Sequence, residues 1–479
     1  MPITTHPTIV WFRDDLRAAD NPALYKAGLR AAPVICVYIR EKVNSLRPLG
    51  GAANWWLHHS LKSLSSTLSS HDVRLVLKTG DPLEILSKMA GNIGADHVMW
   101  NRRYAPDEID IDQKIKFALK GQGLHVESFN ANLLNEPWEI KTGSDKPYKV
   151  FTPYWRACRP QSAPLDNGYE PSFKNQTELN VTSENLADWN LDPENPDWAE
   201  GFSEYWNPGE TGAREQLEEF LGHGIDGYKD NRDVPAQPAT SFLSPYLRFG
   251  EISPKQIWRT LDDRFGDNFS VDAEKFLAEI GWREFSKTLL FYADDLSEKN
   301  WKDEFDSFPW RDDPQGFKAW TQGQTGYPLV DAGMRQLWQK GWMHNRVRMV
   351  TASFLIKHLM INWREGEKWF WDTLVDADAA SNPASWQWVA GSGADASPFF
   401  RIFNPIIQSE KFDPDGDYIR RFVPELKDVP KKHIHAPWAA PKDVLEQAGV
   451  TLGETYPKPI VDHKFARERA LSAYKAMRS

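Results

Sequence analysis

The order of apolar and polar positions predicts alternating strands and helices over the first 130 residues. Short apolar runs rich in β-branched and aromatic residues predict strands, and stretches with an apolar residue every three or four positions predict helices. The predicted strands are Thr8–Phe12, Val34–Tyr38, Val73–Leu77, His97–Trp100 and His125–Phe129. The predicted helices between them include Asn54–Leu68, Pro82–Ala90 and Asp107–Leu119. Strands separated by helices indicate a doubly wound α/β domain with a parallel sheet over residues 1–130.

The pattern changes twice after this α/β region. Over residues 131–208 the periodicity disappears and Pro, Asn, Asp and Glu become frequent, which predicts a long surface connector. Over residues 209–479 the helical period dominates, so we expect an all-α domain there. The helices predicted in it are Gly212–Leu221, Ser253–Phe265, Ala273–Tyr292, Pro314–Trp320, Leu329–Lys340 and Arg346–Ile361.

The composition is that of a soluble globular protein, with 41% apolar and 26% charged residues. The sequence holds no apolar run of about 18 residues, the length that a membrane-spanning helix needs. The two cysteines, Cys36 and Cys158, lie far apart and fit no metal-binding spacing. We therefore expect reduced thiols in a cytoplasmic protein.

Charge and motif content narrow the possible functions. The formal net charge of −10 argues against a nucleic-acid-binding protein, although net charge says little about local basic patches. The sequence contains no G-x-G-x-x-G, G-x-x-x-x-G-K-[ST], H-E-x-x-H, C-x-x-C or G-x-S-x-G motif, and we expect no metal site. The 22 tryptophans suit a protein that binds flat π-systems or transfers electrons, although most of them are expected to pack cores.

Tyr228 and the segment Thr240–Ser244 offer a candidate phosphate site. Hydroxyl groups and backbone N–H groups at the start of a helix bind anions well. The alternative is a plain helix cap, with Ser244 at the N-cap and Pro245 at the first helical position. Without further context, the residues favour the cap.

Two predicted helices each place polar and apolar contact residues on one face, because these residues are three or four positions apart. The two sets are Glu279, Trp282 and Arg283, and Asn345, Arg348 and Met349. The first set could form a binding pocket or, equally, a buried ion pair beside a core tryptophan. A polar turn then brings Asp376 and Asp378 close to Asn382, and carboxylates there can accept hydrogen bonds from ring N–H and hydroxyl groups.

Together these motifs resemble the photolyase/cryptochrome family, and the resemblance covers nearly the whole chain. The matching motifs are Trp11–Arg17, Asp20–Leu24, Trp282–Phe285, Thr325–Asp331, Met343–Met349, Trp363–Glu367, Phe400–Pro405 and Lys411–Asp413. The resemblance implies an N-terminal α/β antenna domain and a C-terminal helical domain that holds one U-shaped FAD. Both agree with the pattern of elements.

The resemblance also implies which residues bind the FAD. Its diphosphate side is implied to contact Tyr228, Thr240, Ser241, Phe242, Leu243 and Ser244. Arg283 is implied to cover the cofactor, while its sugar and ring meet Asn345, Asp376, Ala377 and Asp378. Arg348 is implied to pair with Asp376 beside the isoalloxazine, and Asn382 to face flavin N5.

Within the family, the residues favour repair of cyclobutane pyrimidine dimers. Plant cryptochromes tend to carry Asp where this chain has Asn382, and Glu279 and Met349 match dimer-contacting positions of dimer photolyases. The segment Gly51–His59 differs from the best-known bacterial enzymes, and the chain looks closer to the class III bacterial subgroup nearest to plant cryptochromes. The alternative is a cryptochrome-type blue-light receptor. A generic flavoprotein oxidoreductase is disfavoured by the missing dinucleotide motif.

The implied reaction is light-driven electron transfer from excited reduced FAD to a dimer flipped out of DNA. The implied substrate contacts are Arg232, Glu279, Trp282, Arg346, Met349, Trp388 and Arg401. Glu279 is implied to hydrogen-bond a pyrimidine edge. Damaged DNA is the expected partner, with no membrane and no obligatory protein partner. We expect a monomer in the cytoplasm that is associated with the nucleoid during repair.

The resemblance finally implies an electron supply and an antenna. Trp386, Trp363 and Trp310 match the family's tryptophan chain to oxidised flavin, and neighbouring tryptophans offer a bypass. A second chromophore is implied in the α/β domain, with methenyltetrahydrofolate favoured and a deazaflavin as the alternative. Glu108 is a candidate partner of the pterin, although an acidic residue there could simply favour the start of a helix.

Overall fold

The computed structural model describes residues 6–164, 168–266, 268–399 and 401–478. The chain forms two compact units, each assembled from segments that are distant in sequence. The first unit holds residues 1–198, 206–222 and 241–294, and the second holds residues 199–205, 223–240 and 295–479. Several helices after residue 209 thus belong to the first unit, and the three-part division at residues 130 and 208 stays a prediction.

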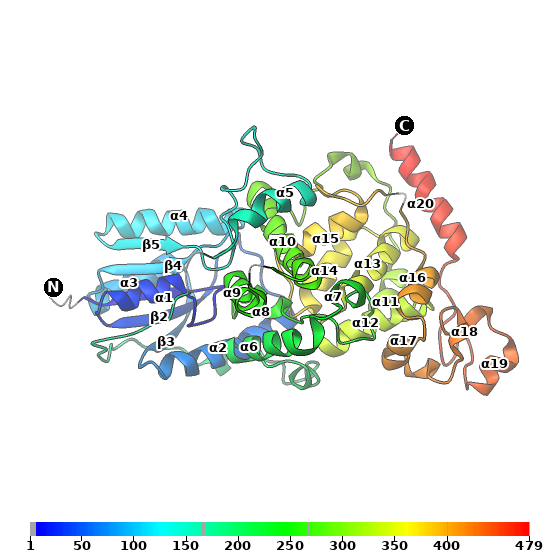
Figure 1. The fold of residues 1–479 in the computed structure, drawn as a ribbon, viewed down its shortest axis with the longest axis horizontal. Coiled ribbons are helices and arrows are strands. Elements are labelled where there is room, and N and C mark those ends of the chain that lie inside the picture. Colours follow the sequence, from blue (N-terminus) through cyan, green and yellow to red (C-terminus); the bar gives the residue numbers. More distant parts are fainter. Residues whose placement is uncertain (1–5, 165–167, 267, 400, 479) are drawn as a thin grey trace. The chain divides into compact units, whose positions relative to one another are not determined.

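A five-stranded sheet forms the centre of the first unit (Figure 1). Its strands are β1 (Thr8–Phe12), β2 (Val34–Glu41), β3 (Arg74–Gly80), β4 (His97–Asn101) and β5 (His125–Phe129). They run in the order β3-β2-β1-β4-β5, and every neighbouring pair is parallel. Strand β1 is buried along its whole length, which is why it appears as a continuous apolar run. The predicted doubly wound α/β fold is confirmed.

The helices of the first unit begin where the sequence provides caps. Their bounds are α1 (Pro22–Leu29), α2 (Gly51–Ser69), α3 (Pro82–Ile93), α4 (Pro106–Gly121), α5 (Phe151–Cys158), α6 (Glu210–Glu219), α8 (Ser244–Arg248), α9 (Pro254–Phe265) and α10 (Val271–Tyr292). Asn21, Asp81 and Ser253 cap α1, α3 and α9 by accepting hydrogen bonds of 3.1, 2.9 and 2.9 Å from backbone N–H groups. A proline follows each of these caps, where its missing N–H costs nothing.

Helix α5 was not predicted from the sequence, because it lies inside the polar segment 131–208. Its buried residues Phe151, Tyr154 and Cys158 follow the helical spacing of three and four, but the helix spans only eight residues. The described remainder of that segment holds only short 3₁₀ turns besides extended and irregular chain. A short amphipathic helix can therefore escape detection when its surroundings are rich in turn-forming residues.

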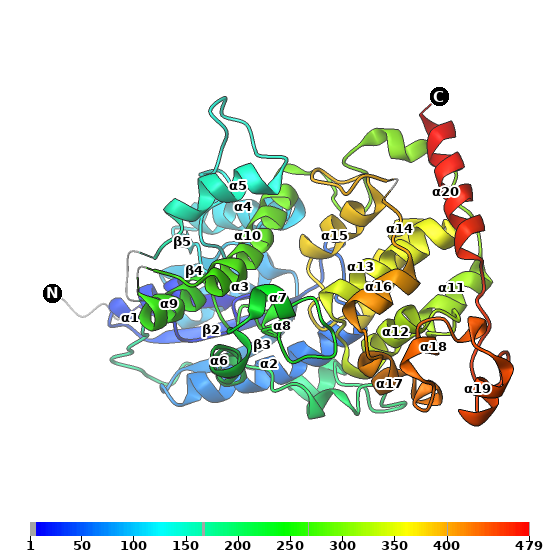
Figure 2. The ribbon, with the colours of Figure 1, turned by 45° about the vertical axis from the view of Figure 1, so that its right-hand side comes forward.

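The regular elements described in the second unit are helical, as predicted (Figure 2). Their bounds are α7 (Tyr228–Asn231), α11 (Pro314–Thr321), α12 (Pro328–Lys340), α13 (Asn345–Ser353), α14 (Trp363–Thr373), α15 (Ser381–Ala390), α16 (Pro405–Phe412), α17 (Asp417–Phe422), α18 (Lys431–Ile434), α19 (Lys442–Gln447) and α20 (His463–Met477). In the described part of the chain, no helix is long and apolar enough to cross a membrane.

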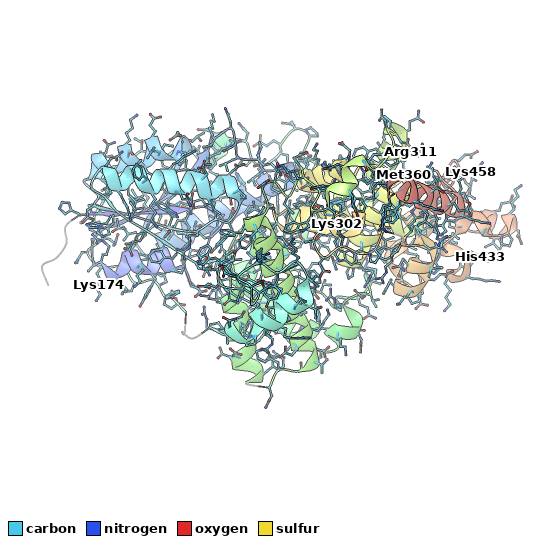
Figure 3. All side chains as sticks on the ribbon, turned by 90° about the horizontal axis from the view of Figure 1, so that it is seen from above. Lys174, Lys302, Arg311, Met360, His433 and Lys458 are labelled. Atoms are coloured by element: carbon cyan, nitrogen blue, oxygen red, sulfur yellow. The ribbon has the colours of Figure 1, made fainter. Side chains whose placement is uncertain are left out.

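The helix predicted over Arg346–Ile361 is not one regular helix. Helix α13 passes into a π-helical segment, Phe354–Leu359, and the chain turns at Met360 with φ +57°. The backbone N–H of Arg311 donates to Met360 O at 2.8 Å, and its guanidinium donates to Leu359 O at 3.2 Å (Figure 3). These bonds satisfy carbonyl groups that the end of a helix leaves without partners.

A buried arginine fixes the loop that follows β1. Arg17 is 0% exposed, and its guanidinium donates to the carbonyl oxygens of Asp20, Ala131 and Gly250 at 2.8, 2.7 and 2.8 Å. The three carbonyls come from the loop itself, from the segment after β5 and from the turn before α9. The arginine that ends the Trp11–Arg17 motif therefore holds distant parts of the first unit together.

The same unit buries a carboxyl group beside an aromatic cluster. Glu251 is 0% exposed, and it accepts a hydrogen bond of 3.1 Å from the indole Nε1 of Trp56 on α2. Burial raises the pKa of Glu251 to about 8. The native protein therefore keeps this proton between about pH 4.5 and 8, where the unfolded chain releases it. The resulting stability is fully present below about pH 4.5 and is lost progressively as the pH rises from there to about 8.

We expect Glu251→Gln to reduce the loss of stability at alkaline pH. The amide cannot ionise, and its oxygen can still accept the Trp56 hydrogen bond. Between pH 6 and pH 9 the variant should lose about 1–3 kcal/mol less free energy of unfolding than the parent. Urea unfolding of both proteins at the two pH values measures this difference, and parallel pH dependences would contradict it.

Candidate functional site

A buried ion pair in the second unit joins two of the predicted flavin contacts. Arg348 on α13 donates to Asp376 in the turn before α15 at 2.8 Å. The Asp376 side chain is only 3% exposed, whereas that of Arg348 is 24% exposed. Asp378, two residues further, accepts from the backbone N–H groups of Ala380 and Ser381 at 2.9 and 2.8 Å. The Asp376 carboxylate therefore pairs with a guanidinium, while the Asp378 carboxylate accepts hydrogen bonds from the backbone of its own turn.

Asn382 is held by a carboxylate that was not predicted as a site residue. Its side-chain nitrogen donates to Glu367 Oε1 at 2.8 Å and to the Glu367 backbone oxygen at 3.1 Å. Since a backbone carbonyl oxygen can only accept hydrogen bonds, the amide must present its nitrogen to Glu367 and direct its oxygen elsewhere. Glu367 lies on α14 and is 1% exposed. It belongs to the motif Trp363–Glu367, but the motif alone gave it no role.

Residues 240–244 form the turn that leads into α8. The helix begins at Ser244 itself, and Leu243 occupies the N-cap without a side-chain capping bond. The plain-cap interpretation, with Ser244 at the N-cap and Pro245 first in the helix, is therefore wrong, because the helix starts one residue earlier. Phe242 adopts φ +52°, which bends the backbone sharply before the helix.

The basic residues predicted to contact DNA already have partners within the second unit. Arg346 pairs with Asp233 at 2.5 Å and lies over the ring of Phe412, with its guanidinium 4.4 Å from the ring centre. The guanidinium of Arg232 lies 5.6 Å from the centre of the Tyr228 ring, and that of Arg401 lies 5.8 Å from the centre of the Phe403 ring. The first residue of the Phe400–Pro405 motif lies outside the described residues.

Met349 and Trp388 belong to the second unit, and both are partly exposed. Asn345 opens α13 and is exposed. Glu279, Trp282 and Arg283 lie instead on α10 of the first unit. The predicted substrate contacts are thus divided between the two units.

On α10, the carboxylate of Glu279 pairs with Lys275 one helical turn earlier at 3.0 Å. The Arg283 guanidinium donates to the backbone oxygens of Asn132 and Leu247 at 2.6 and 3.3 Å. Arg283 therefore links α10 to the segment after β5 and to the end of α8, and its predicted role over the cofactor stays a prediction.

The three tryptophans of the predicted electron chain differ in their surroundings. Trp386 on α15 is 2% exposed and packs edge to face on Phe370 and Trp320, with ring centres 5.0 and 6.2 Å apart. Trp363 is 0% exposed and donates to Asn300 Oδ1 at 2.9 Å. Trp310 is partly exposed. Two buried tryptophans and one partly exposed tryptophan suit a chain that ends at the surface.

Gly366 on α14 allows the close packing of Trp386. A Cβ atom on this glycine would lie 2.2 Å from the indole ring of Trp386, which is far inside van der Waals contact. The indole is therefore fixed against the backbone of α14.

A separate polar cluster lies at the carboxyl ends of β1 and β4, where the strand order reverses. Asn101 donates to Asp15 at 2.6 Å, and Arg103 pairs with Glu41 at 2.6 Å and with Asp112 at 2.7 Å. Such a reversal point is where ligands bind in open α/β sheets.

Nearby, Glu108 accepts from the N–H of Ala105 at 3.1 Å, and burial raises the pKa of its carboxyl group above the usual range. This bond fits the interpretation that Glu108 favours the start of a helix. It leaves the predicted pterin contact untested.

The buried polar groups of the second unit fit a flavin nucleotide. Asp376, Asp378 and Asn382 are 9, 8 and 8% exposed, and together they offer acceptors and an amide to a polar ring edge. Among the described residues, Thr240 Oγ1 is buried without a hydrogen-bond partner, which suits a bound phosphate because buried hydroxyls are normally satisfied. The described residues contain no cluster of three or more His, Cys, Asp or Glu that could hold a metal ion.

Comparison with known proteins identifies the family. Residues 8–172 match the family model described as DNA photolyase, and residues 276–476 match the model described as FAD binding domain of DNA photolyase. A deoxyribodipyrimidine photo-lyase of Agrobacterium fabrum is 57% identical over 100% of this chain and 99% of its own length. Cryptochrome-1 of Arabidopsis thaliana is 38% identical over 98% of this chain and 70% of its own length.

Solved structures agree with these matches. The crystal structure of a bacterial class III photolyase from Agrobacterium tumefaciens superimposes with a TM-score of 0.97 at 57% identity, covering 100% of this chain and 99% of that one. An archaeal photolyase from Sulfolobus tokodaii gives a TM-score of 0.81 at 29% identity, covering 98% of this chain and 100% of that one. The chain belongs to the photolyase/cryptochrome family. The predicted family, its two-part fold and the likeness to class III photolyases are confirmed.

We expect Asn382→Asp to make the protein less stable as the pH rises. The change keeps the size of the side chain but places a second carboxyl group 2.8 Å from that of the buried Glu367. Two buried acidic groups at this distance hold one proton between them, and losing it is costly. The variant should lose about 1–3 kcal/mol more free energy of unfolding than the parent between pH 5 and pH 8.

Urea unfolding at both pH values measures this loss. Adding Glu367→Gln to the variant restores a donor facing an acceptor and should remove most of the extra pH dependence. An unchanged pH dependence in Asn382→Asp would show that the two side chains do not interact.

Proposed function

We propose that this protein uses light to repair cyclobutane pyrimidine dimers in DNA. The observation that carries the proposal is Asn382, an amide at the start of α15 that is fixed by Glu367, just after the turn that holds Asp376 of the Arg348–Asp376 pair. The family resemblance associates an amide at this position with repair enzymes and an acid with plant cryptochromes. The full-length likeness to a deoxyribodipyrimidine photo-lyase supports the same function.

FAD is the proposed cofactor, held by the residues that the family resemblance assigns. When bound, reduced and excited by light, it would supply the electron that opens the cyclobutane ring and would take that electron back once the two pyrimidines have separated. The turn Thr240–Ser244 with Tyr228 would hold the diphosphate, and Asn345, Asp376, Ala377 and Asp378 would hold the sugar and ring. Arg348 would hold Asp376 in place through their 2.8 Å bond.

The orientation of Asn382 would determine what it offers at flavin N5. Because its nitrogen is committed to Glu367, the amide oxygen is the atom that can accept a hydrogen bond from an N–H group. Asn382 would therefore act as an acceptor there, and Glu367 prevents the amide from turning over.

The flipped lesion would contact aromatic and acidic side chains. Trp282 and Trp388 would stack on the pyrimidines, which is worth about 1–3 kcal/mol per base, and Met349 would pack beside them. Glu279 would accept a hydrogen bond from a pyrimidine N–H. Arg232, Arg346 and Arg401 would contact the flanking phosphates, so DNA binding should weaken as salt rises. We propose that the protein acts as a monomer in the cytoplasm.

A blue-light receptor is the second candidate function. It is favoured by the 38% identity with cryptochrome-1 of Arabidopsis thaliana, although this chain spans 70% of that protein's length. Light-dependent repair in a purified reaction separates the two functions, because a receptor without repair activity leaves the dimer intact.

We further propose an antenna chromophore in the α/β domain, with methenyltetrahydrofolate favoured and a deazaflavin as the alternative. Glu108, whose carboxyl group burial keeps protonated to a higher pH than usual, would contact the pterin. The photolyase of Sulfolobus tokodaii holds two FAD molecules, so a flavin is a third possibility for an antenna. The absorption spectrum of the chromophore extracted from the native protein distinguishes the three.

The repair reaction itself is the direct test. Purified protein with reduced flavin is mixed with a duplex oligonucleotide containing one thymine dimer, in blue light and in the dark. We expect the dimer to be converted to two thymines in light only, measured by chromatography of the digested DNA. Equal amounts of dimer in light and dark would refute the proposal.

We expect Trp386→Phe to separate electron supply from repair. The smaller ring keeps most of the packing on Phe370 and Trp320, so the protein should still fold. Photoreduction of oxidised FAD, followed by absorbance, should nearly stop, because the buried member of the electron chain is lost. Repair by chemically reduced protein should continue.

The control is the parent protein under the same light dose. Intact photoreduction in Trp386→Phe would exclude Trp386 from the chain. Intact photoreduction in Trp363→Phe or Trp310→Phe alone would indicate a branched route to the surface.

A further inference from the structure

Three aromatic rings on α5 and α10 form a parallel stack in the first unit. The ring of Phe151 lies face to face with the indole of Trp282, with 3.8 Å between ring centres and 10° between planes. Trp155, one helical turn after Phe151, is also nearly parallel to it, at 6.5 Å and 9°. Figure 2 shows the two helices that carry these rings side by side.

The contact between Phe151 and Trp282 is closer than ordinary aromatic packing. Aromatic pairs in proteins usually lie about 4.5–7 Å apart and prefer offset or edge-on geometry. Phe285 approaches both rings from the side, with centres 6.0 Å away and planes at 69° to Phe151 and 76° to Trp282. The indole plane is therefore set by a ring against its face and a ring across its edge.

Helix α5 can approach α10 this closely because residue 281 is glycine. A Cβ atom there would lie 2.4 Å from the ring of Trp155, so a larger residue would push α5 away. Phe151 is 9% exposed, while Trp282 keeps part of its surface exposed. The buried Phe151 ring thus contacts two partly exposed indoles, one of which is Trp282.

We propose that Phe151 is a positioning residue for substrate recognition, which acts by fixing the plane of Trp282. This inference rests on the proposed function, in which Trp282 stacks on the flipped pyrimidine dimer. A flat surface held in one orientation before binding loses less conformational entropy when a base stacks on it. Helix α5 is therefore part of the recognition machinery although its residues need not touch the lesion.

The test compares binding of two DNA duplexes in the dark, one with a single thymine dimer and one with the same sequence undamaged. Phe151→Leu keeps an apolar side chain but removes the flat ring. It should lower the preference for the damaged duplex about 2- to 10-fold, the range expected for one aromatic contact. Binding of the undamaged duplex should stay unchanged, because phosphate contacts dominate it.

Two further variants test whether the loss of the Phe151 ring causes the lower preference for damaged DNA. Phe151→Tyr keeps the ring and should retain the preference for damaged DNA. Phe269→Leu makes the same type of change on a ring of the first unit that packs near Trp258, and it should leave the preference intact. Thermal unfolding by circular dichroism verifies that each variant is folded, and Phe151→Met replaces Phe151→Leu if the latter does not fold.

A double-mutant cycle with Trp282→Leu tests whether Phe151 acts through Trp282. If Phe151 acts through Trp282, Phe151→Leu causes no further loss of preference once Trp282 is replaced. An additive loss would overturn the inference, and so would an unchanged preference in Phe151→Leu. If the parent protein itself does not prefer damaged DNA, the proposed function fails instead, so the two failures are distinguishable.

Discussion

The first unit depends on the burial of one cation, the guanidinium of Arg17. Removing a charged group from water is costly, and a buried guanidinium is tolerated only when its N–H donors find acceptors. The acceptors are backbone carbonyls from the loop after β1, the segment after β5 and the turn before α9, together with the side-chain oxygen of Asn132 at 3.1 Å. Moving any of these segments would leave part of the cation without acceptors, so the loop after the central strand fixes where the helical part of the unit begins.

The same constraint positions the α10 residues within that unit. Arg283 bonds to the backbone at Asn132, next to the Ala131 carbonyl that Arg17 uses, and to the end of α8 at Leu247. Glu284, beside it, is buried and accepts from the N–H of Leu134 at 2.8 Å. Arg283 and Glu284 thus attach α10 to the segment that follows β5. The second unit uses a different device, in which α13, α14 and α15 are joined through Arg348, Asp376, Glu367 and Asn382.

The sequence predicted an element well where residues close to it in the chain determine that element. Strands β1 and β5 match their predicted bounds, and α3 and α9 start at a capping side chain followed by proline. Features that depend on tertiary contacts could not be predicted from the sequence. Helix α5 is only eight residues long, and the π-helical segment after α13 is ended by bonds from Arg311, which is distant in sequence.

The same contrast between local and tertiary causes applies to the candidate site. The polar turn at Asp376–Asn382 was identified from the sequence, and the pairing of Arg348 with Asp376 was implied by family resemblance. Glu367 was not recognised, because a single acid in a helix resembles a solvated charge until the structure shows it buried against Asn382. Phe151 was missed for a related reason, since the partner that gives it a role lies 131 positions away.

The two cysteines have a consequence for measuring local opening of the fold. Cys36 lies in β2 and Cys158 ends α5, and neither has exposed surface. Burial raises the pKa of Cys158 to about 11 and raises that of Cys36 as well, so neither thiol is a reactive thiolate in the native protein. The alkylation rate of Cys158 therefore measures the transient detachment of α5, whereas that of Cys36 measures disruption of the parallel sheet. The alkylation rates of the two cysteines thus report separately on the opening of α5 and on the opening of the sheet.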